Sequence, residues 1–178
     1  MTEKRNILFR FIAFVIVTLI LAGAQTSFWV HVFGSMTPPA FWLIVILYLS
    51  LQRENNEGLL TVFFLSFILA VFTSLNDGLL TLTHLAIFFT ARFVKSRVFA
   101  FSGWYFGAAC GLAVPFFSLS HFLLSQPFDS NPPTNIEWLG LLFQIPLTAF
   151  FGLVLFPMFL FIDSFFKDEI TENWRGTL

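Results

Sequence analysis

Long runs without a charged side chain dominate the pattern of apolar and polar positions along this chain. The five longest uncharged runs are Phe11–Gln52, Gly58–Asn76, Gly78–Ala91, Val98–Phe128 and Trp138–Ile162. A helix that crosses a bilayer needs about 20 predominantly apolar residues. Because lipid satisfies no backbone hydrogen bonds, only helices and closed barrels cross membranes, and continuous apolar runs favour helices. The pattern therefore predicts a polytopic α-helical membrane protein.

Turn-forming and charged residues divide these runs into six predicted helices. We expect an all-α integral membrane bundle of six transmembrane helices, one membrane domain over residues 1–178, with helices near 7–24, 40–52, 58–75, 79–94, 98–125 and 136–162. The breaks include Thr37-Pro38-Pro39 and Asn76-Asp77-Gly78, which have the residue types of turns. The helices at 40–52 and 79–94 are short for a hydrocarbon core about 30 Å thick. They need local bilayer thinning, snorkelling of flanking cations, or burial against neighbouring helices.

The positions of the positive residues predict how the six helices are oriented. With the N-terminus in the cytoplasm, all 9 Lys and Arg residues fall on the cytoplasmic side. The loops on the other side then carry only the acidic residues Asp77, Asp129 and Glu137. Cytoplasmic loops of membrane proteins carry an excess of Lys and Arg. We therefore predict that both termini lie in the cytoplasm.

Composition supports a membrane protein and argues against other classes. Hydrophobic residues make up 57% of the chain and charged residues 11%, whereas soluble domains carry about 25% charged residues. The mean hydropathy is +0.84. A formal net charge of −1 gives no indication of nucleic-acid binding. The single cysteine, Cys110, is interpreted as a buried, inert thiol, because one thiol makes neither an internal disulfide nor a zinc site.

The N-terminal region has the features of a secretory signal. Basic residues precede the apolar run Phe11–Ala24, which ends in the small-residue triplet Ala22-Gly23-Ala24. Because the rest of the chain is equally apolar, we expect an uncleaved first transmembrane helix.

Small and polar residues form stripes on the last two predicted helices. One stripe consists of Gly103, Gly107 and Gly111, and the other of Gly140, Gln144, Thr148 and Gly152. Spacing of four residues places each set on one helix face, where small side chains allow another helix to approach closely. The stripes either pack helices against each other within the protein or dock a single-span partner helix.

Two polar segments flank the predicted fourth helix. Asn76, Asp77 and Gly78 form the turn before it, where an anion suits the helix dipole. Arg92, Lys95 and Arg97 form a basic corner on the predicted cytoplasmic side. This corner suits the anionic headgroups of the membrane or an acidic cytoplasmic partner.

Few residues within the predicted helices carry chemistry. His84 and His121 have no acidic partner within the helices, so we interpret both as neutral, hydrogen-bonded histidines rather than a proton relay. The sequence contains no carboxylate at membrane depth, cysteine cluster, phosphate-binding loop or catalytic triad pattern. We therefore expect no catalytic residue, no metal site and no cofactor. Pro115, Pro146 and Pro157 kink the last two helices, either as plain curvature or to shape a cavity.

The layout of these helices resembles the MreD family, the small membrane subunit of the bacterial rod-shape system. The residues that carry the resemblance are a short basic N-terminus, Pro39-Ala40-Phe41-Trp42, Tyr48-Leu49, Gly58, the turn from Thr73-Ser74 to Gly78, Leu85 and Pro157. MreD proteins often carry an aspartate shortly before that turn, where this chain has Ala70.

The resemblance implies a non-enzymatic scaffold in the bacterial cytoplasmic membrane. MreD proteins associate with MreC, a single-span protein, and with it belong to the elongasome, which couples the MreB filament to peptidoglycan synthases. The resemblance also implies a fold akin to the S-components of vitamin transporters, which are six-helix proteins of this size. A substrate-binding membrane subunit is therefore the alternative. It would need polar groups around a cavity near the outer face, for which the candidates are Gln25, His31, Asn76, Asp77, His121 and Gln126.

Overall fold

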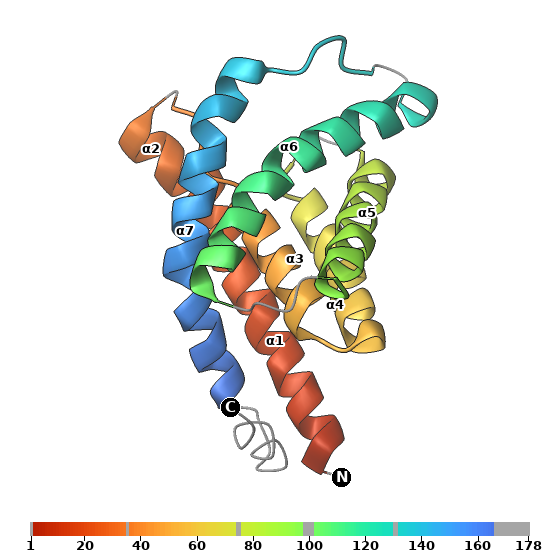
Figure 1. Cartoon of the computed structure of the whole chain (residues 1–178), viewed down its shortest axis with the longest axis vertical. Coiled ribbons are helices and arrows are strands. Elements are labelled where there is room, and N and C mark those ends of the chain that lie inside the picture. The colour runs from red at the N-terminus through yellow and green to blue at the C-terminus, as the bar shows by residue number, and fades with distance from the viewer. Residues whose placement is uncertain (1, 35, 74–75, 98–101, 130–131, 166–178) are drawn as a thin grey trace.

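The computed structural model describes residues 2–34, 36–73, 76–97, 102–129 and 132–165, and every regular element over these residues is a helix. In chain order they are α1 Thr2–Gly23, the π-helical turn η1 Ala24–Phe28, α2 Trp29–Phe33, α3 Phe41–Gln52, α4 Asn55–Ala70, α5 Asp77–Lys95, α6 Gly103–Phe128 and α7 Trp138–Ser164. Because α1, η1 and α2 follow one another without a break, the described residues form six helical rods (Figure 1). The predicted all-α membrane bundle is confirmed.

Four of these rods are long and apolar enough to cross a membrane by length and composition. They are the rod 7–33 with 27 residues, α5 with 19, α6 with 26 and α7 with 27. The remaining two, α3 with 12 residues and α4 with 16, are shorter. At 1.5 Å per residue they extend for about 18 Å and about 24 Å, so their place in the bundle needs a separate explanation.

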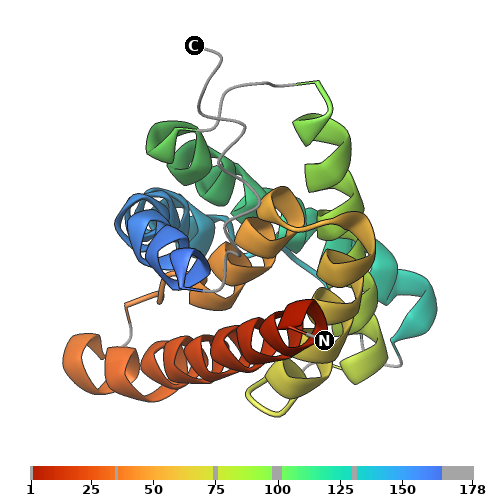
Figure 2. The same cartoon turned by 90° about the horizontal axis from the view of Figure 1, so that it is seen from below.

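The shortest of the six rods, α3, lies at the centre of the bundle. Residues 43–50 are each at most 4% exposed. Seen from below, α3 is enclosed by α1, α7, α6 and the pair of α4 and α5 (Figure 2). A helix that is apolar on all sides suits such a position. Burial against neighbouring helices, one of the predicted remedies, therefore accommodates this short helix.

The first rod is longer than its sequence pattern predicts. The predicted end near residue 24 is wrong, because the helix continues through η1 and α2 to Phe33. Gln25, Thr26 and Ser27 are polar, but none of them breaks a helix, and the Thr26 hydroxyl donates to the Ala22 carbonyl at 2.9 Å. The rod ends where Gly34 adopts a φ of 63°, which glycine tolerates without steric cost.

Other helix boundaries differ from the prediction by a few residues. The predicted third helix extends to residue 75, but α4 ends at Ala70, and residues 74–75 lie outside the described part. The predicted start of the fifth helix at residue 98 also lies outside it, and α6 begins at Gly103. At its other end α6 continues past Ser125 to Phe128. Turn-forming residues indicate that a break lies between two helices, but they do not fix the last hydrogen-bonded residue of each helix.

The two ends of the bundle differ in charge. The basic end, at the bottom of Figure 1, is where α1 begins, α3 ends, α4 begins and α7 ends. The described Arg and Lys side chains, all at this end, are those of Arg10, Arg53, Arg92, Lys95 and Arg97. The far end carries the start of α5 and the segment 132–137 that leads into α7. This separation is what the predicted orientation requires.

Candidate functional site

An ionic cluster joins four helices at the basic end. Arg53, the residue after α3, pairs through Nη2 with the carboxylate of Asp163 near the end of α7. The Tyr48 hydroxyl donates to the same carboxylate at 2.7 Å. Glu57 of α4 lies 3.6 Å from Arg53 and 3.8 Å from Arg10 of α1, measured between nitrogen and oxygen. The cluster therefore ties α1, α3, α4 and α7 together.

Electrostatics explain why Arg53 and Asp163 depend on each other. Asp163 lies in the last turn of α7, where the helix dipole disfavours an anion. The side chains of Arg53 and Asp163 are 5% and 16% exposed, so each needs the other to offset the loss of hydration. Burial lowers the pKa of Arg53 from its ordinary value, and the Asp163 and Glu57 carboxylates oppose that shift. An arginine keeps its charge under such conditions.

Aromatic rings fill the space beneath this ion pair. Tyr48 is fully buried and stacks on Phe14, with ring centroids 5.6 Å apart. Phe159 packs against Tyr48 at 4.9 Å, and the Arg53 guanidinium lies 5.1 Å from the centre of the Phe14 ring. The ion pair is therefore supported by a rigid apolar base contributed by α1, α3 and α7.

The residues of the predicted basic corner have two different roles. Arg92 Nη2 donates to the carbonyl of Arg53, and Lys95 Nζ donates to the carbonyl of Leu51. These two cations thus satisfy two carbonyls at the end of α3, where the last carbonyls lack partners within the helix. Arg97 is exposed, and its guanidinium lies over the Phe93 ring at 4.9 Å.

An open polar hollow lies beside this corner. Its volume is about 580 Å³, and its lining residues are Gln52, Arg53, Glu54, Asn56, Arg92 and Lys95. Arginine and lysine side chains outnumber the single carboxylate in this lining, so the hollow presents positive charge.

The glycine stripe of α6 faces α7. A methyl group on Gly107 would lie 2.6 Å from Leu153 Cγ and 3.0 Å from the Ala149 carbonyl oxygen. One on Gly111 would lie 3.1 Å from Ala149 Cβ, while one on Gly103 would meet only a Phe156 ring carbon at 3.5 Å. Gly107 and Gly111 therefore allow the close approach of the two helices, and Gly103 lies at the looser end of the same face.

The stripe of α7 has two separate contacts. Gly152 faces α6, where an added methyl group would lie 2.9 Å from both Cys110 Cβ and Sγ. Gly140 lies beside Thr37, and Gln144 Nε2 donates to the Pro38 carbonyl at 3.0 Å. Thus the lower part of the stripe packs a helix, whereas the upper part holds the extended segment that precedes α3.

Thr148 completes the support of that extended segment. Its hydroxyl oxygen accepts a hydrogen bond from the backbone N–H of Ala40 at 3.0 Å, and both residues are buried. The next backbone N–H, of Phe41, donates to the side-chain oxygen of Gln25 in η1 at 3.0 Å. Non-helical backbone at membrane depth needs such partners. The polar residues of η1 and α7 therefore make possible the chain break that precedes α3.

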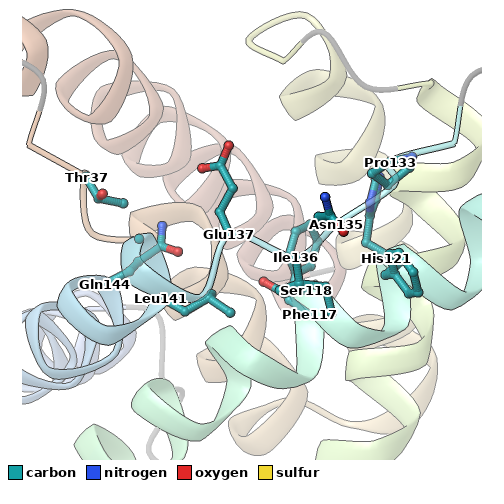
Figure 3. Close-up of a pocket in the computed structure, with 12 residues that line it drawn as sticks. Thr37, Phe117, Ser118, His121, Pro133, Asn135, Ile136, Glu137, Leu141 and Gln144 are labelled. Carbon is teal, nitrogen blue, oxygen red and sulfur yellow. The ribbon is translucent and has the colours of Figure 1, made fainter.

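A cleft with polar lining opens at the far end between α6 and α7 (Figure 3). Its volume is about 290 Å³, and its polar lining residues are Thr37, Ser118, His121, Asn135, Glu137 and Gln144. The Nε2 atom of His121 is buried and has no hydrogen-bond partner among the described residues. Among the far-end candidates that the sequence offers, His121 lines this cleft. His31 is exposed on α2, and Gln126 Nε2 bonds the Pro133 carbonyl at 3.4 Å.

His84 is fully buried and bonded through one ring nitrogen. Its Nδ1 lies 2.8 Å from the Ser66 hydroxyl oxygen, and that hydroxyl donates to the Val62 carbonyl at 2.7 Å. The Ser66 hydroxyl has one proton, which it donates to the Val62 carbonyl. In the bond between Ser66 and His84, Nδ1 is therefore the donor, and the unprotonated Nε2 is an acceptor. The His84 ring packs on Trp42 with centroids 4.9 Å apart, beside a cavity of about 60 Å³.

The predicted turn at the far end caps a helix. Asn76 is the N-cap of α5, and its side-chain oxygen accepts from the Gly78 N–H at 3.0 Å. Asp77 is the first residue of α5, where its charge suits the dipole. These three residues begin the helix and lie apart from the polar cleft. Over the described residues no group of three or more His, Cys, Asp or Glu side chains is placed to hold a metal ion.

The residues that hold the basic end and the α3 entry together do not stand out in the sequence. Asp163 belongs to no motif, and Tyr48 belongs only to the residues that carry the family resemblance. One sequence feature does point to Asp163. It directly follows the uncharged run 138–162 and therefore marks where α7 reaches the membrane surface. Its partner Arg53 is 110 residues away, and no local pattern joins the two.

No family model, curated protein or solved structure matches this chain. Its function is therefore argued from its own residues and their geometry.

Proposed function

We propose that this protein is a non-enzymatic membrane scaffold of the MreD kind, acting in the bacterial cytoplasmic membrane. The observation that supports this proposal most directly is the basic end, where Arg53, Asp163, Tyr48 and Glu57 tie four helices together. In this proposal a single-span MreC-like protein binds the bundle. Through it, an MreB-like filament and cell-wall synthases are coupled across the membrane.

A scaffold has to hold its docking surfaces in a fixed arrangement. At the basic end the ion pair, the hydroxyl of Tyr48 and the aromatic base beneath them connect helices from both halves of the chain. The positively charged hollow and the exposed Arg97 lie on this tied end. An acidic cytoplasmic segment of a partner suits such a surface, because complementary charge speeds association and suppresses wrong partners.

The partner helix is placed on a lipid-facing surface in this proposal. Gly107, Gly111 and Gly152 already lie in the contact between α6 and α7, and Gln144 and Thr148 hold the segment before α3. Docking a foreign helix on either stripe would require these contacts to open. The outer faces of α1, α6 and α7 carry large exposed apolar side chains and need no such rearrangement.

Co-purification from gently solubilised native membranes, followed by mass spectrometry, tests the proposal. We expect recovery of a single-span MreC-like protein together with cell-wall synthesis enzymes. The variant Arg97→Glu reverses an exposed charge at the basic end and should lower the recovery of cytoplasmic partners severalfold. The variant Thr134→Glu, which introduces the same side chain at the exposed far end, serves as the control and should leave that recovery unchanged.

A substrate-binding membrane subunit is the second candidate, supported by the far-end cleft. That cleft has a volume of about 290 Å³, near the lower limit of ligand pockets, and a buried nitrogen of His121 that has no hydrogen-bond partner among the described residues. The same co-purification distinguishes the two functions. Recovery of a pair of ATPases with a coupling subunit, or of a bound small molecule, would replace the scaffold proposal with a transporter subunit.

A further inference from the structure

An apolar groove runs along the lipid-facing side of the bundle between α5 and α6. It has a volume of about 240 Å³ and almost entirely apolar lining, formed by Leu47, Leu51, Ile87, Thr90, Ala91, Val94, Ala109, Leu112, Ala113 and Phe116. Two leucines of the buried helix α3 form its floor, and small residues of α5 and α6 leave it open. The groove therefore exposes part of the bundle core to the membrane.

The groove leads toward the cations of the basic corner. Ile87 and Ala91 of α5 line it, and Lys95 follows them at the same four-residue spacing, so all three share one helix face. On the floor, Leu51 lines the groove with its side chain while its carbonyl accepts a hydrogen bond from Lys95 Nζ. The α5 wall and the α3 floor thus meet at the Lys95 ammonium. From Ile87 to Lys95 the helix rises about 12 Å.

The polar hollow lies next to this point. Lys95 and Arg92 line the hollow, and their neighbours in the chain, Val94 and Ala91, line the groove. Arg92 donates to the Arg53 carbonyl and lies over the Phe88 ring at 5.3 Å, and neither of these partners carries a charge. Its Nε atom is buried and has no hydrogen-bond partner among the described residues. An anion placed in the hollow would meet both cations.

We propose that the groove and the hollow together form a binding site for one anionic phospholipid. An acyl chain occupies the groove between α5 and α6, and the phosphate of the headgroup lies at Lys95 and Arg92. An apolar channel that ends in cations matches the chemistry of such a lipid, and basic pockets between helices on the cytoplasmic side are suited to anionic headgroups. This inference does not depend on the proposed scaffold function.

Native mass spectrometry of the purified full-length protein tests the site. The protein in detergent micelles is titrated with phosphatidylglycerol or with phosphatidylcholine, and the bound fraction is measured. We expect phosphatidylglycerol to bind the wild type at least about fivefold more tightly, the ratio that corresponds to about 1 kcal/mol for one cation near an anionic lipid. Equal binding of the two lipids would overturn the proposal.

Two variants with matched controls separate the headgroup from the acyl chain. Lys95→Gln keeps a donor for the Leu51 carbonyl but removes the charge, so the preference for phosphatidylglycerol should fall about fivefold. Arg97→Gln removes an exposed cation that lines neither hollow nor groove, and should leave the preference unchanged. Ala109→Leu fills the groove and should weaken the binding of both lipids. Ala108→Leu places the same side chain at the exposed neighbouring position and should weaken the binding of neither lipid.

Other occupants give different results. Glycerol phosphate has the headgroup chemistry without the acyl chains. If it bound as tightly as phosphatidylglycerol and resisted Ala109→Leu, the site would be one for a soluble anion, and the lipid proposal would be wrong. If a photo-crosslinking residue at position 109 captured the transmembrane helix of another protein in native membranes, with no phospholipid retained, a partner helix would replace the lipid.

Discussion

At Gly107 the backbone of α6 approaches α7 so closely that no side chain fits. We predict that Gly107→Ala lowers the free energy of unfolding by about 1–3 kcal/mol relative to Gly103→Ala, because an added methyl group would collide with Leu153 and the Ala149 carbonyl. Thermal unfolding in detergent micelles measures the difference. At Gly103 the nearest atom lies 3.5 Å from the added methyl group, so the same substitution causes no collision there.

Equal stability of the Gly107→Ala and Gly103→Ala variants would show that the α6–α7 contact adapts, and that its glycines are not required for close packing.

The ion pair of Arg53 and Asp163 also contributes to the stability of the bundle. Asp163→Asn should lower the free energy of unfolding by about 3 kcal/mol, because it leaves the buried Arg53 guanidinium without its carboxylate. The matched change Glu57→Gln removes a carboxylate that is 23% exposed and lies 3.6 Å from the same arginine, and should cost at most about 1 kcal/mol. Thermal unfolding of both variants measures this order, and its reversal would place the main support of Arg53 on Glu57.

The central position of α3 is not visible in its own sequence. Its apolar residues predicted a helix and the prolines before it predicted a break, but neither pattern shows that the helix is central or that the break is hydrogen-bonded. Those facts depend on Thr148 and Gln25, which are 108 and 16 residues away from their backbone partners Ala40 and Phe41. Local patterns do not report contacts between distant segments.

Thr148→Val tests the support of the α3 entry. Valine keeps the shape of threonine but leaves the buried N–H of Ala40 without an acceptor, so we predict a loss of about 1–3 kcal/mol in stability. Thr18→Val is the matched control. Thr18 is equally buried, but its hydroxyl donates to a carbonyl of its own helix, Phe14, so its replacement should have a much smaller effect.

Thermal unfolding, together with protein accumulation in the membrane, measures both threonine variants. If Thr148→Val and Thr18→Val were equally stable, the Ala40 N–H would have another partner and the account of the chain break would be wrong.

The first rod shows a different limit of sequence reasoning. Gln25, Thr26 and Ser27 are polar and follow the predicted helix end near residue 24, yet they lie in η1, inside a continuous helix. Polarity alone does not end a helix when the backbone stays bonded and no proline intervenes. The π-helical turn places the Gln25 side chain where it meets α3, and such turns often occur at positions with a specific role.

At the scale of the whole molecule, the runs of apolar residues and the positions of Lys and Arg were enough to predict a six-helix bundle with a basic end. Both features follow from the local composition of the chain, because segments that cross a bilayer must be apolar and the positions of Lys and Arg follow the orientation of the helices. The ionic cluster, the far-end cleft and the groove between α5 and α6 could not be predicted in this way, because each is formed by residues that come from at least two helices and lie far apart in the sequence.

We propose that all six helical rods cross the membrane, including the short α3 and α4, with the basic end in the cytoplasm. Cysteine accessibility in a Cys110→Ser background tests it most directly, with single cysteines replacing the exposed Glu54 and Ser96 at the basic end and Asp77 and Thr134 at the far end.

A membrane-impermeant maleimide is applied to intact cells and then to permeabilised cells. We predict that the cysteines at positions 77 and 134 are labelled in intact cells, whereas those at 54 and 96 are labelled only after permeabilisation. Labelling of positions 54 and 77 from the same side would show that α4 does not cross the membrane, and would contradict the six-helix account.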